Sequence, residues 1–437
     1  MSSAVVMPIT GIEMHRITQE GGLAQVKAAG AYWVRRNSLN WAAVEPVEGE
    51  RNWAAVSDLE TELQAASAQG LQVILIVRAA PAWAQKVPGV ACGPVHPDKL
   101  GAFASFMQDA VERYSAAPYG IKYWELGNEP DVDPVYVKPD GPFGCWGDPN
   151  DPQYGGAFYG QMLKTVYPRI KQADPQAQVL VGGLLLDCDP VNPPENPPGS
   201  GQFKDCKPSL FLEGILEAGG GDFFDGVSFH AYDFYFGQTG VYGNDNWHSA
   251  WNVTGPVLIA KASYLKNLLA TTGQPDKFLM NTEVALLCGR DGKEPECQTE
   301  TFELTKAYYA AQANAAALAE GLQANVWYSY LGWRASGLAE RNSGKTLPAY
   351  DALRFSASQL QGASYVGPVS AEAGVLGYVF KRDQHTVWLV WSADGNDHAL
   401  ELPKPPTQVF DVFGITIPLS AEIKAGLAPV YLVWAPE

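Results

Sequence analysis

The chain has 437 residues, of which 46% are hydrophobic and 18% charged, and a formal net charge of −17. This length suits one large globular domain and a small one. The negative charge disfavours nucleic acid and anionic membranes as partners, because both need a basic face, but it is compatible with a neutral sugar. The sequence has no apolar run approaching the ~20 residues of a membrane span. The first residues show no signal peptide, so either none exists or the numbering starts after its removal.

Short β-like runs alternate with helical runs over the first 360 residues. The clearest helix is predicted over 98–116, where apolar residues recur at the spacing of one helix face. Strands are predicted at 9–14, 32–36, 73–77, 122–126, 178–182, 226–229, 278–282 and 325–328. Helices are predicted at 56–68, 98–116, 157–173, 209–217, 256–270, 300–320 and 349–360. Such β–α repeats predict an α/β fold, the closed parallel (β/α)8 TIM barrel.

The pattern changes after about residue 360. Short alternating or apolar runs replace the helices, and turn sequences such as Asp394-Gly395-Asn396 separate them. These runs fall at 377–380, 387–391, 399–402, 408–413 and 430–434. We therefore predict a barrel domain over residues 1–360 and a small accessory antiparallel β-sandwich over 361–437.

Two glutamates stand at the ends of predicted barrel strands. Glu129 follows an apolar run within Asn128-Glu129-Pro130, and Glu283 ends the run 277–283. The carboxyl ends of barrel strands meet on the face where active sites are built, so the two side chains are expected to lie close together. Such a pair can cleave a glycosidic bond, one group acting as acid/base and the other as nucleophile. Taken singly, each can instead be a capping or salt-bridging residue.

Several segments, in chain order, resemble the retaining glycoside hydrolases of clan A, and in particular glycoside hydrolase family 39 and its relatives. The resemblance runs over roughly residues 9–358 and implies their barrel fold and activity. The segments that carry it are Trp-Ala-Ala-Val-Glu-Pro at 41–46, Asn-Glu-Pro at 128–130, His-Ala-Tyr at 230–232, Thr-Glu at 282–283 and the stretch 345–350 ending in Pro-Ala-Tyr.

The resemblance implies the roles of the central residues. Glu129 is expected to be the acid/base and Glu283 the nucleophile. Asn128 is expected to hydrogen-bond the 2-hydroxyl of the sugar, a contact that strengthens in the transition state. The alternative is that Asn128 is a turn residue and that Glu129 and Glu283 are structural carboxylates. The flanking motifs favour the catalytic interpretation.

Four further residues complete the expected site. Tyr232 is a candidate donor to the nucleophile, His230 would line the same site, and Trp327 resembles the clan's aromatic platform for the cleaved sugar. An arginine ending the second strand is expected to contact the nucleophile and lower its pKa. The spacing to the next motif favours Arg36 for this role, while Arg35 remains the alternative, because neighbouring strand residues point to opposite sides.

Six cysteines fall in predicted loops that follow strands. Sequence alone does not select their pairing, but this placement favours disulfides that pin the loops, with 92–145, 188–206 and 288–297 as the preferred pairs. Disulfides imply an oxidising compartment, so we predict an extracellular or periplasmic protein. Six reduced thiols in a cytoplasmic enzyme are the alternative.

The sequence therefore predicts a retaining glycoside hydrolase acting on β-linked oligo- or polysaccharides, without a metal or other cofactor. An exo-acting β-xylosidase or β-glucosidase is favoured. An endo-acting β-glycanase on a microbial or plant polysaccharide is the first alternative. The second is a carbohydrate-binding barrel without activity.

Overall fold

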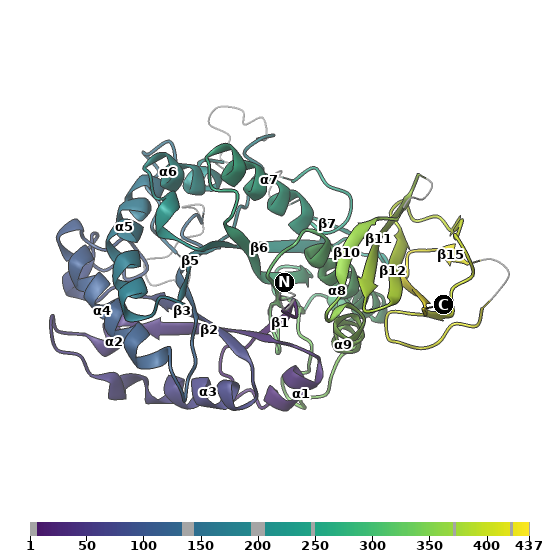
Figure 1. Cartoon of the computed structure of the whole chain (residues 1–437), viewed down its shortest axis with the longest axis horizontal. Helices are drawn as coiled ribbons and strands as arrows, with labels where there is room; N and C mark the ends of the chain where they lie inside the picture. The colour runs from purple at the N-terminus through teal and green to yellow at the C-terminus, as the bar shows by residue number, and fades with distance from the viewer. Residues whose placement is uncertain are drawn as a thin grey trace.

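The computed structural model describes residues 7–132, 144–193, 206–245, 250–369, 373–419 and 423–436. Eight parallel strands form a closed ring, in which β9 returns to β1 and β5 pairs with β6. Helices surround this ring, and a smaller β-layer, formed by the C-terminal residues, lies beside α8 and α9 (Figure 1). The predicted (β/α)8 barrel is thus confirmed. Its strands are β1 (Thr10–Glu13), β2 (Trp33–Asn40), β3 (Gln72–Arg78), β4 (Tyr123–Asn128), β5 (Gln178–Leu184), β6 (Gly226–Tyr235), β8 (Phe278–Leu287) and β9 (Ala324–Trp327).

The helices of the barrel agree with the predicted ones except at its start. The short helices α1 and α2 were not predicted, because six and four residues are too few to show a helical period. The helices are α1 (Leu23–Ala28), α2 (Trp41–Val44), α3 (Ser57–Ala68), α4 (Leu100–Tyr114), α5 (Gly156–Ala173), α6 (Phe211–Glu217), α7 (Leu258–Thr271), α8 (Glu300–Ala319) and α9 (Pro348–Leu360). Among the described residues, no helix is both long and apolar enough to cross a membrane.

Alternation along the strands decides which side chains fill the barrel interior. Trp33, Tyr123 and Met280 belong to one buried cluster inside the ring. Because strand side chains alternate, the residues two positions after Trp33 and Tyr123 also point inwards, one layer nearer the carboxyl ends. These are Arg35 and Glu125, whose side chains are fully buried and hydrogen-bonded to each other. A polar layer therefore lies directly beneath the face where the strands end.

The C-terminal residues form the predicted antiparallel β-layers. The larger sheet has the order β10-β11-β12-β16-β14, and β13 pairs with β15. One face of the larger sheet buries Phe380, Leu389 and Tyr431 against alanines of α8 and α9. Helix α8 is consequently buried on nearly every side, because the barrel covers one side and this sheet the other. The strands are β10 (Ser364–Pro368), β11 (Val375–Arg382), β12 (His385–Ser392), β13 (His398–Ala399), β14 (Gln408–Phe410), β15 (Lys424–Ala425) and β16 (Val430–Trp434).

Candidate active site

The structure brings the two glutamates together at the carboxyl ends of the barrel strands. Glu129 directly follows β4, and Glu283 lies within β8. One oxygen of each carboxyl group and one ring nitrogen of His230 all lie within 4.8 Å of one another. The backbone of Glu129 has a φ of 48°, which residues other than glycine seldom adopt. Strain of this kind is typical of functional positions, where the surrounding structure holds the side chain in place.

Arg35, and not Arg36, contacts Glu283. The buried guanidinium of Arg35 donates hydrogen bonds to Glu283 and, at 2.6 Å, to Oδ1 of Asn128. The prediction that Arg36 lies in the site is wrong: its Nε donates to Oε2 of Glu62 on α3, outside the barrel, at 2.5 Å. The reason is strand alternation, because Trp33 points into the barrel and Arg36 is three positions further on.

Two side chains from β6 complete the contacts of the carboxyl pair. The hydroxyl of Tyr232 donates to Oε2 of Glu283, as expected of a donor to the nucleophile. Nδ1 of His230 lies 2.8 Å from Oε1 of Glu129 and 3.5 Å from Oε2 of Glu283. The imidazole of His230 therefore lies between the two carboxyl groups.

Trp327 does not face the site, so it cannot be the predicted sugar platform. Its ring is 1% exposed and packs against Tyr309 of α8, and its Nε1 donates to the carbonyl of Ser336 at 2.8 Å. The next residue, Tyr328, faces the site instead. Its ring packs edge-on against Tyr232, with centroids 6.0 Å apart, and against His15 at 5.5 Å. Alternation explains the difference, since Ala324 and Val326 point inwards and Tyr328 continues their series.

Two buried glutamates that the motifs did not indicate also belong to the site. Glu13, the last residue of β1, accepts from Nη1 of Arg35 at 2.8 Å. Glu125 accepts from Nε of Arg35 at 2.7 Å and from the hydroxyls of Ser228 at 2.6 Å and Thr282 at 3.1 Å. A glutamate at an inward position of an apolar strand was the available signal, because a buried carboxylate requires a buried partner.

The charges and hydrogen-bond donors that act on the pKa of Glu129 differ from those that act on the pKa of Glu283. Burial raises the pKa of Glu129 well above its ordinary value, and the nearby charge of Glu283 raises it further. Burial raises the pKa of Glu283 to about 8, although the Arg35 guanidinium and the Tyr232 hydroxyl act in the opposite direction. Burial lowers the pKa of His230 well below its ordinary value, so the partner of Glu129 is a neutral imidazole. Glu283 is therefore the member of the pair whose charged form is stabilised by donors, and Glu129 is the member that favours keeping its proton.

Three residues of the site also offer donor atoms that could hold a metal ion. Glu129, His230 and Glu283 offer two oxygens and one nitrogen, which is a donor set that metal ions accept. However, Arg35 places a fixed positive charge directly on Glu283, and that charge repels a cation at this position. We therefore interpret the cluster as a carboxyl pair rather than a metal centre.

A small cavity of about 40 Å³ borders Asn128, the residue before Glu129. It lies over the ends of β3 and β4, where Arg78 and Asn128 border it. Aromatic side chains of the hydrophobic core line it as well, and each of them is less than a tenth exposed. These are Trp41, Phe103 and Trp146.

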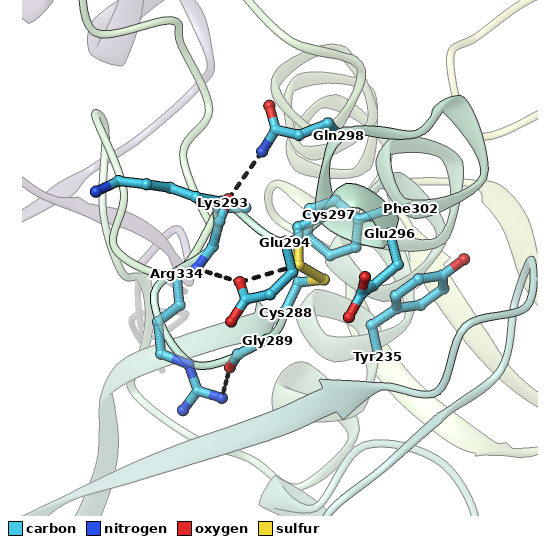
Figure 2. The surroundings of a disulfide bond; sticks show 12 residues. Tyr235, Cys288, Gly289, Lys293, Glu294, Glu296, Cys297, Gln298, Phe302 and Arg334 are labelled. Carbon is cyan, nitrogen blue, oxygen red and sulfur yellow. Dashed lines mark hydrogen bonds between the residues drawn. A yellow bond between two sulfur atoms is a disulfide. The ribbon is translucent and has the colours of Figure 1, made fainter.

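Three disulfides join the cysteines in the preferred pairs, Cys92–Cys145, Cys188–Cys206 and Cys288–Cys297. The third closes the loop after β8 and begins five residues beyond the nucleophile candidate. Figure 2 shows Arg334, from the loop after β9, beside this bond, with its guanidinium donating to the carbonyl of Gly289. The backbone N–H of Cys288 in turn donates to the carbonyl of Arg334 at 3.0 Å. The disulfide therefore closes the loop after β8, and the two hydrogen bonds join this loop to the loop after β9.

Replacing both Cys288 and Cys297 by serine is expected to impair catalysis more than stability. The closed loop spans nine residues, for which loop closure predicts only about 2–3 kcal/mol. The free energy of unfolding and kcat/KM of the double variant should be measured together. The Cys188→Ser/Cys206→Ser variant is the control on a different loop. A large loss of stability with unchanged kcat/KM would contradict this expectation.

Comparison with known proteins finds solved structures of similar fold. No protein-family model and no curated protein matches the sequence. Among solved structures, a family 39 glycoside hydrolase from the gut symbiont Bacteroides cellulosilyticus WH2 superposes with a TM-score of 0.71 at 19% identity, over 98% of this chain and 80% of that one. A GH30 endoxylanase from Clostridium papyrosolvens C71 has a TM-score of 0.62 at 13% identity, over 98% and 96% of the two chains. A monomeric β-xylosidase from Caulobacter crescentus CB15 has a TM-score of 0.57 at 13% identity, over 99% and 96%.

These likenesses establish a shared fold over nearly the whole chain. The protein has the barrel-plus-sandwich fold of clan A glycoside hydrolases of families 39 and 30. The predicted resemblance to family 39 is confirmed at this level. Because identities are below 20%, activity has to be argued from the site itself.

Proposed function

We propose that the protein is a retaining glycoside hydrolase that cleaves β-linked glycans by double displacement. The observation that carries this proposal is the approach of the Glu129 and Glu283 carboxyl oxygens to within 4.8 Å. Retaining enzymes hold their two carboxyl groups about 5–5.5 Å apart, whereas inverting enzymes leave room for a water at about 6.5–9.5 Å. The short separation therefore supports retention.

The contacts assign a step to each side chain. Glu283, ionised and held by Arg35 and Tyr232, attacks the anomeric carbon and forms a covalent glycosyl-enzyme. Glu129 gives its proton to the leaving oxygen and then removes a proton from the water that hydrolyses this intermediate. Asn128, whose Oδ1 is fixed by Arg35, presents its amide N–H groups to the sugar 2-hydroxyl.

The substrate is an oligo- or polysaccharide, and we favour an exo-acting β-xylosidase or β-glucosidase. Loops tied by three disulfides border the site, which suits a pocket for a terminal sugar. An endo-acting β-glycanase is the second candidate, because a GH30 endoxylanase shares the fold of this chain. A panel of 4-nitrophenyl β-glycosides and matching oligosaccharides distinguishes these activities. A protein that binds these sugars and hydrolyses none of them would be a carbohydrate-binding barrel.

Replacing Glu129 by alanine is expected to slow natural glycosides far more than aryl glycosides with good leaving groups. A stable phenolate leaves with little protonation, so the first step loses less of its rate. The measurement is kcat/KM of wild type and variant over a series of phenols of rising pKa. Equal losses across the series would argue against an acid role for Glu129.

We further propose that the protein works outside the cytoplasm, in an extracellular or periplasmic space. The support is chemical: three disulfides persist where conditions are oxidising. Residues 1–360 are proposed as the catalytic domain. Residues 361–437 are proposed as an accessory domain that covers α8 and α9. Mass spectrometry of the non-reduced, alkylated protein tests the first point, and six alkylated cysteines would overturn it.

A further inference from the structure

One guanidinium serves three buried carboxyl groups inside the barrel. Arg35 donates to Glu13, Glu125 and Glu283, and all of these side chains are less than a tenth exposed. The three carboxylates together outnumber the one positive charge. How the charge of Arg35 is shared among them therefore affects the nucleophile candidate directly.

The sharing is most direct between Glu13 and Glu283. Both accept from the same atom, Nη1 of Arg35, which lies 2.8 Å from Oε2 of Glu13. Glu125 uses a different atom, Nε, and has the hydroxyls of Ser228 and Thr282 as additional donors. Glu13 is thus the carboxylate that competes with Glu283 for one donor.

We propose that Glu13 is a positioning residue that sets the acid limit of catalysis, by sharing Nη1 of Arg35 with Glu283. This inference rests on the proposed function of Glu283 as nucleophile. Glu13 holds one end of the shared donor and places a second negative charge near the nucleophile. Both effects make Glu283 easier to protonate, so Glu283 loses its charge at a higher pH than it would beside Arg35 alone.

The groups that act on Glu13 lie on β2, on β4 and in the loop after β1. Burial raises the pKa of Glu13 to about 7, the charges of Glu125 and Glu20 act in the same direction, and Arg35 on β2 opposes them. The negative charge of Glu13 in turn raises the pKa of Glu283 on β8 and of Tyr328 after β9. Arg35 is therefore the one cation among these neighbours.

The test is the pH dependence of kcat/KM for Glu13→Gln, which removes the charge and keeps the shape. The nucleophile must be ionised, so its pKa sets the acidic limb of the profile for the free enzyme. Removing a negative neighbour lowers that pKa, and the limb is expected to move to lower pH by about one unit or more. An aryl glycoside with a good leaving group is the substrate, because Glu129 then has little influence.

The partner of Arg36, the residue next to Arg35, supplies the matched control. Glu62 is also a buried carboxylate and pairs with Arg36, but outside the barrel. Glu62→Gln should therefore leave the acidic limb in place. Glu13→Asp retains the charge, so its limb should stay closer to wild type than that of Glu13→Gln. Unchanged limbs in all three variants, or a uniform loss of activity at every pH in Glu13→Gln, would overturn the proposal.

A titration independent of turnover separates this inference from the proposed function. Protein labelled with ¹³C at glutamate Cδ reports each carboxyl group, and the spectrum of Glu283→Gln identifies the signal of Glu283. This signal should titrate at lower pH in Glu13→Gln than in wild type. If it does so in a protein that hydrolyses no glycoside, the proposed function fails, while the coupling of Glu13 to Glu283 stands. If it titrates at the same pH in both, the inference fails whatever the activity.

Discussion

Glu283→Ala is expected to abolish turnover, with a loss of about 10⁵-fold or more in kcat, the scale seen when a nucleophile is removed. The side chain supplies the bond that replaces the leaving group, and the other acceptors of Arg35 cannot take its place. Glu13 and Glu125 belong to the layer beneath the strand ends and are almost fully buried, with exposures of 1% and 0%.

Azide is expected to restore part of the activity of this variant on an activated aryl β-glycoside. Alanine leaves a space on the α face of the sugar, where a small anion can attack. The product should therefore be the α-glycosyl azide, identified by NMR, while wild type with azide serves as the control. A β-glycosyl azide, or a variant as active as wild type, would refute the assignment of Glu283.

Arg35→Met is expected to destabilise the protein and remove activity together. It leaves three buried carboxyl groups without their cation, and breaking a buried ion pair from one side costs about 3–5 kcal/mol. This is a large share of the roughly 5–15 kcal/mol that holds a typical protein folded. Loss of the donor to Glu283 and Asn128 also misplaces the nucleophile, so kcat should fall by about 10³-fold or more.

The destabilisation of this variant should depend on pH in a definite direction. The Arg35 charge lowers the pKa of Glu13 and of Glu283, so its removal raises both further above their values in the unfolded chain. The folded state then binds protons more tightly than the unfolded one, and stability is fully present below about pH 4. It is lost as the pH rises through the folded-state values. The deficit in Tm relative to wild type should therefore be larger at pH 8 than at pH 5.

Arg36→Met is the matched control for this prediction. Arg36 is the next residue along β2, yet its partner Glu62 lies outside the barrel. The control breaks one ion pair and touches no part of the site, so it should keep kcat within about threefold of wild type. Equal losses of kcat in the two variants would show that strand integrity, and not the Arg35 contacts, governs activity.

Much of the fold could be predicted from the sequence, because the barrel strands and helices are long enough to show their periods. The exceptions have local causes. Helices α1 and α2 are too short for periodicity, and β6 and β8 run about five residues beyond their predicted ends. Their extensions carry polar residues such as Asp233, which is buried and accepts from the N–H of Val257 at 2.9 Å. Such tertiary partners are invisible in a single sequence.

The site was predicted where motifs marked it and missed where only strand direction decides. Glu129 and Glu283 were found because each follows or ends an apolar run in the sequence. Arg36 was selected by its spacing to the next motif and Trp327 by its resemblance to the clan's platform, whereas Arg35 and Tyr328 occupy the inward positions. Fixing the inward side of each strand from its buried aromatic or aliphatic residues would have selected the correct members of both pairs.

The most direct test of the central claim is to trap the glycosyl-enzyme. A 2-deoxy-2-fluoro-β-glycoside with a good leaving group, of whichever sugar the panel identifies, forms the covalent intermediate and hydrolyses it slowly. Intact mass spectrometry should show one added sugar per chain, and peptide mapping should place it on Glu283, with no label on the Glu283→Ala variant. A label on Glu129, or turnover of the parent glycoside with inversion and no label at all, would contradict the account.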